Sequence, residues 1–369
     1  MNASIPRLML LCLLICLASG TVTGDETPLL DDHRRLGDPV RVENLTVWPV
    51  FTNAPVTTEA ILSLHDAQAK GLAQVRETGE AERGGATVNR LVIENRGDRP
   101  ILVTAGTILK GGKQDRQIGQ DLVVAAGATV PVDAFCVERG RWTDEREGRR
   151  TGGVFEVTKV KAAKRVRAAA HYDKDQGEVW RQVEEVNDKA ENAPATSTFL
   201  ATVEDDEATA SRTRIEVAVR SYFAGLDGQT VVGFAYAVNG EPIGMRTFAN
   251  RELLDAHFEP FAKTMSLEAQ VAQQRDRKTG KAVFDETASG AALLEMVRGV
   301  AKATPETRQT ASINQNRLRK NEWGGQSSCL IPSAGRWLPL TEDWTAPVEL
   351  TPEVRRELLE LRALGYTDP

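Results

Sequence analysis

The sequence is poor in the residues that usually build disulfide frameworks and metal sites. It contains four cysteines and four histidines in 369 residues. Two of the cysteines fall in an N-terminal apolar run, which leaves Cys136 and Cys329, too few for a disulfide framework or a closed zinc site. The histidines are scattered, and none stands in an HxxxH or HExxH spacing. We therefore expect no metal and no other cofactor.

The sequence leaves open whether Cys136 and Cys329 form one disulfide. Both lie in strand-like segments, and we predict that they are close enough to bridge. Two buried thiols fit the sequence equally well, because a disulfide needs a Cα separation below about 7 Å that spacing along the chain does not give.

Positive charge is not in excess, and long apolar runs are absent beyond the N-terminus. The net charge of −6 argues against general affinity for nucleic acid. The run Leu8–Ala18 spans about eleven residues, too short for a hydrocarbon core about 30 Å thick. It follows a positively charged lead and precedes small residues. We therefore predict a signal peptide over residues 1–24, export to the periplasm or the extracellular space, and no transmembrane segment in the mature chain.

The remaining composition, 41% hydrophobic and 27% charged, is that of an ordinary globular protein. The first half is rich in short strand-like runs separated by glycine-bearing turns, which predicts a sandwich or an open barrel. One helix is expected within it, over Glu59–Glu77. The predicted strands are Leu45–Phe51, Thr87–Asn95, Arg99–Ala105, Asp121–Ala125 and Ala128–Val137.

The second half changes to helical periodicity. Two β-strands interrupt it, joined at Asn239-Gly240, a pair that readily forms the tight turn of a hairpin. Pro242 predicts that the second of these strands lies near a sheet edge. This order indicates an α+β fold. The predicted elements are helices in Lys159–Val186, Ile215–Leu226, Leu253–Met265 and Ala291–Ala301, the hairpin strands Val231–Val238 and Ile243–Phe248, and a closing β-meander over Asn314–Leu340.

The chain therefore divides into a leader at residues 25–40, an α+β domain at 41–345 and a C-terminal helix at 346–369. Within the domain, residues 41–142 are β-rich, and residues 143–345 hold the helices and the hairpin. Thr351 and Pro352 are typical of a helix start and Gly365 of a helix end. Because a helix of about four turns is marginal alone, we expect it to dock on the body or on a partner.

Five positive charges lie between Lys159 and Arg167: Lys159, Lys161, Lys164, Arg165 and Arg167. On a helix, such a run is usually a solvated face. An anion-binding or anionic-lipid face is the alternative. Few aromatic residues lie among these charges, so the run does not indicate nucleic-acid binding.

The first candidate site is the glycine turn Gly111–Arg116. Its glycines allow backbone N–H groups to approach a ligand, and Lys113, Gln114 and Arg116 supply donors for an anion. The spacing rules out a phosphate-binding P-loop, because a glycine stands where the lysine should be. The simpler interpretation is a β-turn with solvated charges.

The second candidate site is Cys136–Trp142. Glu138 could act as an acid or base if buried, Arg141 could bind a carboxylate or phosphate, and Trp142 could offer a stacking surface. An internal ion pair between Glu138 and Arg141, with Trp142 in the core, explains the same residues without a ligand.

These motifs carry a family resemblance. Taken together, GGKQDR, CVERGRW, QGEVW and the hairpin VVGFAYAVNGEPIGMRTF resemble the ARPP-1 domain family, a domain of unknown function named for its association with ADP-ribosylglycohydrolase and rhodanese-phosphatase proteins. The likeness extends over most of the chain, leaving out the signal peptide and the C-terminal helix. The resemblance implies ADP-ribose or NAD-derived nucleotides as ligands and implies no specific activity.

Two functions from different classes fit the residues. One is an exported soluble module that binds an anionic small molecule or a partner protein. The other is an enzyme that acts on a phosphorylated or ADP-ribose-derived molecule, with Glu138 as the catalytic group and Lys113, Arg116 and Arg141 stabilising charge. The sequence favours binding and leaves open whether the protein is an enzyme. A dispersed arrangement of Glu138, Lys113 and Arg141 would exclude the enzyme, whereas their convergence on one pocket is compatible with both functions.

Overall fold

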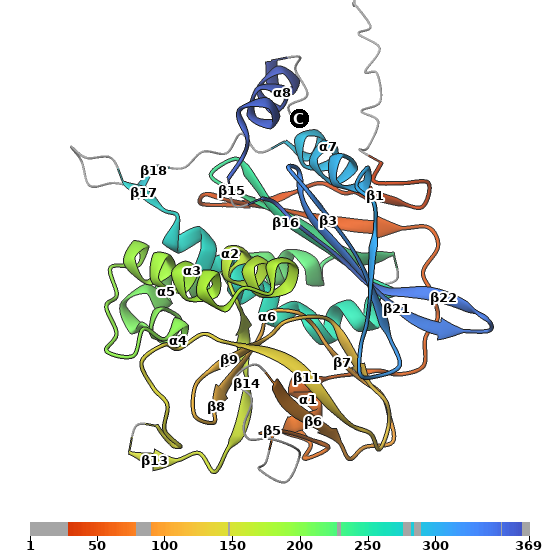
Figure 1. Ribbon diagram of the computed structural model, residues 1–369. Helices are drawn as coiled ribbons and strands as arrows, with labels where there is room; N and C mark the ends of the chain where they lie inside the picture. Colours follow the sequence, from red (N-terminus) through yellow and green to blue (C-terminus); the bar gives the residue numbers. More distant parts are fainter. Residues whose placement is uncertain are drawn as a thin grey trace, which may run out of the picture.

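The computed structural model describes residues 29–78, 90–146, 148–226, 230–275, 282–283, 289–347 and 349–363. Its fold is α+β, as predicted. A β-barrel lies at one end and a large antiparallel sheet covered by helices at the other (Figure 1). The signal peptide and the helix end predicted at Gly365 lie outside the described residues. No helix in the described part is long and apolar enough to cross a membrane.

The barrel comprises most of the β-rich first half and is closed, in the strand order β11-β6-β5-β14-β8-β9. Its interior is filled by apolar side chains such as Val75, Ile93 and Leu109, which are fully buried. Its strands are β5 (Ala73–Glu77), β6 (Arg90–Asn95), β8 (Thr107–Gly111), β9 (Arg116–Ile118), β11 (Thr129–Cys136) and β14 (Val154–Lys161).

The large sheet combines strands from both ends of the chain in the order β1-β3-β15-β16-β22-β21-β20-β19, with β2 beside β3. Strands that are distant in sequence therefore become neighbours. Its strands are β1 (Arg34–Leu36), β2 (Val40–Val42), β3 (Leu45–Thr52), β15 (Val231–Val238), β16 (Glu241–Phe248), β19 (Glu306–Gln309), β20 (Gln315–Asn321), β21 (Gly324–Ser333) and β22 (Arg336–Thr345).

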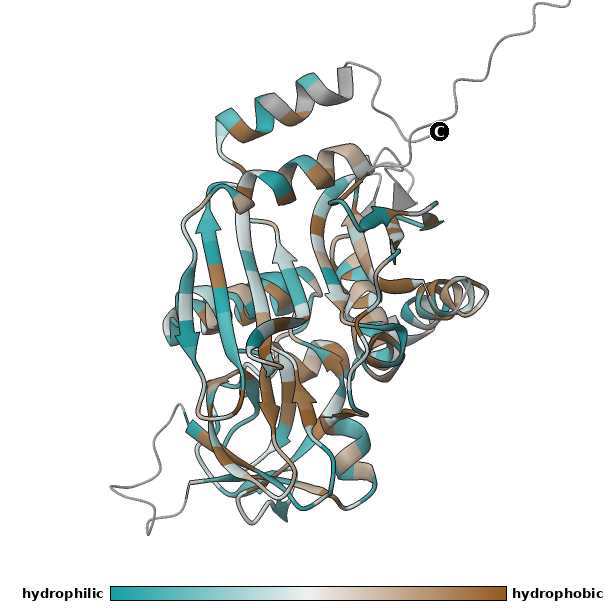
Figure 2. Cartoon of the chain, turned by 90° about the vertical axis from the view of Figure 1, so that its right-hand side faces the viewer, coloured by the Kyte–Doolittle hydropathy of each residue, from teal (hydrophilic) through white to brown (hydrophobic). Residues whose placement is uncertain are grey.

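Helices cover both faces of this sheet. Along β15, Phe234 and Tyr236 pack against α5 and α6, whereas Ala235 and Ala237 lie in the cluster with α7 and α8. The strand is consequently buried throughout, as expected for a strand covered on both faces. Figure 2 shows the most hydrophobic strand segments in the lower part of the molecule, where the barrel lies. The helices are α1 (Leu64–Ala69), α2 (Lys164–Ala168) with the π-helix η2 (Ala169–Asp173), α3 (Gln176–Lys189), α4 (Phe199–Val203), α5 (Asp206–Ala224), α6 (Arg251–Val271), α7 (Gly290–Ala301) and α8 (Pro352–Ala363).

Short strands complete the described structure: β4 (Leu62–Ser63), β7 (Ile101–Val103), β10 (Leu122–Val124), β12 (Glu145–Arg146), β13 (Arg149–Arg150), β17 (Gln274–Arg275) and β18 (Ala282–Val283). Of these, β10, β7 and β4 form a separate small sheet, and β12 with β13 and β17 with β18 form two sheets of two strands.

The hairpin and the C-terminal helix form as their sequences predict. Asn239 and Gly240 have φ angles of 49° and 75°, the conformation of a type I′ turn. Thr351 accepts a hydrogen bond from the Val354 amide at 3.3 Å and so caps α8. Val354 and Leu358 are buried in the cluster that contains α7. The C-terminal helix therefore docks on the body of the protein.

Three local predictions are wrong. The segment predicted as one helix over Glu59–Glu77 contains the short strand Leu62–Ser63, the short α1 and then β5, because its apolar residues pack into the barrel core. The helix expected from Lys159 begins instead at Lys164, after the end of β14. The strand containing Pro242 is internal, since β16 pairs with both β15 and β22. Its proline lies beyond the stretch paired with β22, opposite Ala237 of β15 and next to an irregularity in the register of that pair.

Candidate anion-binding site at the barrel end

The two sequence motifs lie side by side at one end of the barrel. Strand β9 begins at Arg116 and pairs with β11, which places Arg116 opposite Cys136. The Val137 amide donates to the Asp115 carbonyl at 2.9 Å, which continues the contact beyond the strands. Strand β10, which lies between the two motifs in the sequence, belongs to another sheet. Direct pairing thus brings the motifs together.

The glycines of the first motif are explained by packing. Gly112 has a φ of 47°, and a Cβ there would lie 2.1 Å from the Phe155 ring. Gly111 has a φ of 133°, and its Cβ would lie 2.5 Å from the Val154 carbonyl oxygen. The turn therefore needs glycine in order to lie against β14, and no ligand is required to explain it.

Arg141 is held entirely by the protein. Its Nε and Nη2 donate to Glu138, at 3.0 and 2.8 Å, and Nη2 also donates to the Gly111 carbonyl at 3.1 Å. Its Nη1 donates to the carbonyls of Gly112 and Thr143, at 2.7 and 3.0 Å. A guanidinium has five N–H donors, and these contacts use all of them. Arg141 consequently has no donor left for a ligand, and the geometry favours the internal ion pair over the predicted ligand contact.

Glu138 is likewise part of the framework. It is buried, and its carboxylate accepts hydrogen bonds from Arg141 and, at 3.0 Å, from the backbone amide of Asp115. The second carboxylate, Asp115, accepts from Arg146 at 2.5 Å and from Thr198 at 3.0 Å. Burial and the nearby Glu138 raise the pKa of Asp115, against the opposing effect of Arg146. Two carboxylates and two arginines thus form a compensated buried network.

Arg116 differs from Arg141 because no carboxylate pairs with it. It is 2% exposed, and no ion pair within 4 Å joins it to an acidic group of the described residues. Its Nη1 donates to the Gln114 side-chain oxygen at 2.9 Å and contacts the Cys136 sulfur, while its buried Nε has no hydrogen-bond partner. Burial lowers the pKa of Arg116. A guanidinium placed in this way retains capacity for an anion.

Lys113 and Trp142 complete the site. The Lys113 Nζ and the Arg116 Cζ each lie 5.7 Å from the centre of the Trp142 ring. Trp142 is 47% exposed, which is high for so large an apolar side chain. Lys113 is half-buried, and its backbone amide donates to Glu77 at 2.7 Å. We call Lys113, Gln114, Arg116 and Trp142 the barrel-end site.

Cys136 and Cys329 are not bridged to each other. Cys136 lies in β11 of the barrel, and Cys329 lies in β21 of the large sheet, where its sulfur accepts from Asn314 at 3.3 Å. Burial raises the pKa of both thiols. The predicted bridge is therefore absent, because the two strands belong to different sheets.

A second buried charge network, which the sequence did not reveal, joins the segment before β10 and helix α2 to the large sheet. Asp121 pairs with Arg246, and Asp343 lies 3.4 Å from Arg246 and 3.7 Å from Arg167. All four side chains are almost completely buried. Thr341 also donates to Asp121, at 2.5 Å. Since its partners come from four distant segments, no local motif could have indicated it.

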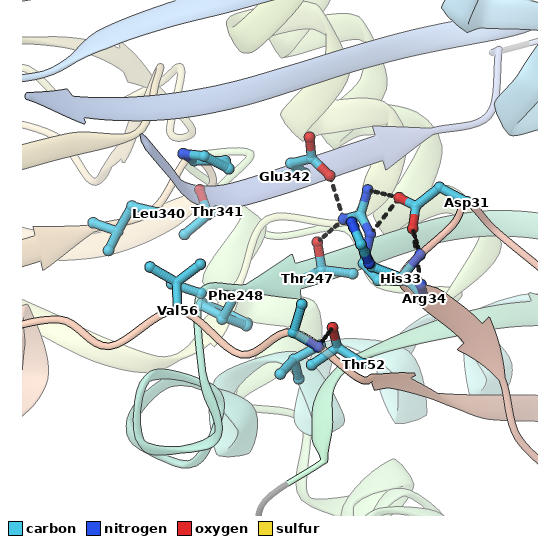
Figure 3. Close-up of a pocket in the computed structure, with 14 residues that line it drawn as sticks. Asp31, His33, Arg34, Thr52, Val56, Thr247, Phe248, Leu340, Thr341 and Glu342 are labelled. Atoms are coloured by element: carbon cyan, nitrogen blue, oxygen red, sulfur yellow. Dashed lines mark hydrogen bonds and ion pairs between the residues drawn. The ribbon is translucent and has the colours of Figure 1, made fainter. Parts of the chain in front are cut away.

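A pocket of about 240 Å³ opens beside β16 and β22 (Figure 3). Arg34 reaches into this region, where it donates to Asp31 at 2.7 Å and to Thr247 at 3.0 Å and pairs with Glu342. Phe248 forms part of the apolar wall. With two carboxylates around one guanidinium, this pocket has no spare positive charge and is a poorer candidate for an anion.

Within the described residues, no group of three or more histidine, cysteine or acidic side chains could hold a metal ion.

One protein-family model matches the chain. It is the ARG and Rhodanese-Phosphatase-superfamily-associated Protein domain, ARPP-1, and it covers residues 33–341. The match includes both motifs of the barrel-end site. No curated protein and no solved structure matches the chain.

Proposed function

The chain belongs to the ARPP-1 domain family, and on that premise we propose that it is an exported binding module whose barrel-end site takes an anionic small molecule. The observation that carries the proposal is the buried guanidinium of Arg116. A buried charge normally has a partner, because desolvation costs several kcal/mol. An anion placed against Arg116 would supply that partner.

The side chains around Arg116 suggest the chemical class of ligand. The Gln114 side-chain oxygen accepts a hydrogen bond from Nη1 of Arg116 at 2.9 Å and so orients the guanidinium. The Nε of Arg116 has no hydrogen-bond partner. Phosphate and carboxylate groups match the planar donor geometry of arginine. Lys113 adds a second cation, and the exposed part of Trp142 can stack on a flat or apolar part of the molecule. A phosphorylated or carboxylated molecule with a ring therefore fits the site best.

The alternative function is an enzyme acting on a phosphorylated or ADP-ribose-derived molecule. The family name supports the ligand class, but the geometry gives Glu138 less support as the catalytic group. Its carboxylate oxygens are engaged by Arg141 and by the Asp115 amide. A general base needs an accessible oxygen near the substrate, and these contacts occupy Glu138.

Export is the other part of the proposal, and it rests on the sequence of residues 1–24. Intact-mass analysis of secreted protein should show loss of the segment up to a point between Ala18 and Asp25. Exported material that retains the apolar run would contradict removal of a signal peptide.

Binding is tested by a thermal-shift screen of the mature protein against pyrophosphate, ADP-ribose and citrate. A ligand at 100 times its Kd should stabilise the protein by about 2.7 kcal/mol. Lys113→Ala should weaken binding by about 1.5–3 kcal/mol without a large loss of stability, because its ammonium makes no ion pair with the described residues. Arg35→Ala is the matched control, since Arg35 also lies over an aromatic ring, that of Phe51, but on the large sheet. Equal weakening by both variants would refute the assignment.

A further inference from the structure

The last residue of β14, Lys161, faces inward. It is 6% exposed and lines a pocket of about 280 Å³ between β14, α1 and α6. Its Nζ donates to the hydroxyls of Thr104 and Thr107, at 2.7 and 2.6 Å, and both threonines also line the pocket. The structure thus places a primary amine and two hydroxyl groups together at a small cavity.

No acidic side chain of the described residues forms an ion pair with Lys161 within 4 Å. The charges of Arg246 and Arg167 disfavour the ammonium form of Lys161, and the charge of Asp121 favours it. Asp121 is already paired with Arg246, and Asp343 lies near both arginines. Two arginines balance two aspartates, so Lys161 is the uncompensated charge of this region. Burial, reinforced by Arg246 and Arg167, lowers the pKa of Lys161 to about 7.

The other titratable group deep in the pocket, His257, does not compete for this role. Its Nδ1 lies 2.8 Å from the Leu253 carbonyl and its Nε2 lies 3.3 Å from the Leu102 carbonyl. Burial lowers its pKa to about 4. The ring is therefore neutral at pH 7, and both of its nitrogens face the backbone.

The wall also carries carboxylates. Asp66 accepts a hydrogen bond from the Ser63 hydroxyl at 2.8 Å, and the His65 Nδ1 lies 3.6 Å from its carboxylate. Asp255 forms an ion pair with Arg251. Glu259 lies 3.6 Å from Lys159 and 3.1 Å from Lys263. These carboxylates disfavour entry of an anion, so an uncharged ligand fits the pocket better. The cavity is slightly smaller than the roughly 300–1,000 Å³ of pockets for drug-sized ligands.

We propose that Lys161 is a nucleophilic amine that forms an imine with a small, uncharged aldehyde or ketone in this pocket. Lysines become nucleophilic when they are desolvated or lie next to other cations, and both conditions hold here. This site is separate from the barrel-end site, so it does not depend on the proposed function.

The reaction uses only the amine and the carbonyl compound. The neutral Nζ attacks the carbonyl carbon and forms a C–N bond, while the C=O π electrons move to oxygen. Transfer of a proton from nitrogen to that oxygen gives a carbinolamine. The hydroxyl leaves as water, and loss of the remaining N–H proton gives the C=N bond. One amine and one carbonyl group thus give one imine and one water, with no change in oxidation state.

Reductive labelling of the wild-type protein with propanal and cyanoborohydride at about pH 7 tests the proposal. Lys159 is an internal control, because it lines the same pocket, is 53% exposed and is two residues away. About half of Lys161 is neutral at this pH, compared with about one in 10³ for an ordinary lysine. Peptide mass spectrometry should therefore show labelling of Lys161 at least about tenfold faster than Lys159.

Labelling of Lys161 no faster than Lys159 would overturn the proposal, whether the cause is low reactivity or a closed pocket. A second arm replaces propanal with glyoxylate, an aldehyde that carries a carboxylate. We expect propanal to label Lys161 faster than glyoxylate does. Faster labelling by glyoxylate would contradict the proposal that the ligand is uncharged. Between about pH 6 and about pH 8 the labelling rate of Lys161 should rise and then level off near pH 7.

Discussion

Replacing Lys161 by methionine should remove a specific dependence of stability on pH. The side chains have similar length, and methionine has no titratable group, so the variant isolates the buried amine. In the folded protein the pKa of Lys161 is about 7, whereas an unfolded chain has a lysine pKa of about 10.4. Between these values the unfolded state binds more protons than the folded state. The free energy of unfolding of the wild type therefore rises as the pH rises through this range.

The size of the effect follows from these two pKa values. One pKa unit corresponds to about 1.4 kcal/mol, and the full difference between the states would be worth about 5 kcal/mol. Integrating the proton difference from about pH 7 to about pH 9 gives a gain of about 2 kcal/mol for the wild type. Lys161→Met lacks this contribution. All other groups titrate in both proteins and cancel in the comparison.

Urea unfolding of the wild type and the variant at these two pH values measures the effect. The wild-type free energy of unfolding should gain about 2 kcal/mol relative to that of the variant as the pH rises. A difference between the two proteins that stays constant would show that Lys161 titrates normally. It would also remove the basis for preferential labelling of this amine.

Three other changes test the buried groups. Asp343→Ala should lower the free energy of unfolding by about 3–5 kcal/mol, because Arg246 and Arg167 would lose a buried partner; a loss below about 1 kcal/mol in urea would contradict the network. Acidification from about pH 6.5 to about pH 4 should lower the free energy of unfolding of the wild type by about 3 kcal/mol more than that of His257→Gln. The reason is that the pKa of His257 in the folded protein, about 4, lies below that of a free histidine. Identical dependence of unfolding on pH in the two proteins would refute this. Arg141→Ala should lower the melting temperature and leave ligand affinity unchanged, since Arg141 is engaged with Glu138; loss of affinity in a folded variant would restore Arg141 to the binding site.

The elements that could be predicted are those determined by local pattern. The strands Leu45–Thr52 and Thr129–Cys136 and the turn at Asn239-Gly240 appear where expected. Neighbouring residues suffice to specify such elements, through side-chain alternation and the positive φ angles of the turn. The segment after Glu59 was misread because short apolar runs do not distinguish a buried helix from a barrel strand.

The basic run after Lys159 shows what local pattern cannot give. It was interpreted as a solvated face, but Lys161 and Arg167 are buried, one at the end of a strand and the other in a helix. Their neighbours Asp121, Arg246 and Asp343 are far away in the sequence. Only the tertiary fold determines which charges in such a run are desolvated.

The candidate site was predictable in part. Sequence reasoning placed Arg116 and Arg141 near one another, and direct pairing of β9 with β11 accounts for their proximity. It could not distinguish their roles, because both are arginines that follow glycine-bearing turns. The difference lies in the surroundings: Glu138 and backbone carbonyls use every donor of Arg141, whereas Arg116 meets an amide and a thiol.

The central claim is that Arg116 and its neighbours bind an anion, and calorimetric titration of the mature protein with ADP-ribose tests it most directly. The wild type and Arg35→Ala should bind with equal affinity, and Lys113→Ala should bind at least about tenfold more weakly. Arg116→Gln, shown to be folded by circular dichroism, should lose binding. Unchanged affinity in both the Lys113 and the Arg116 variants, or no heat of binding in the wild type, would contradict the account.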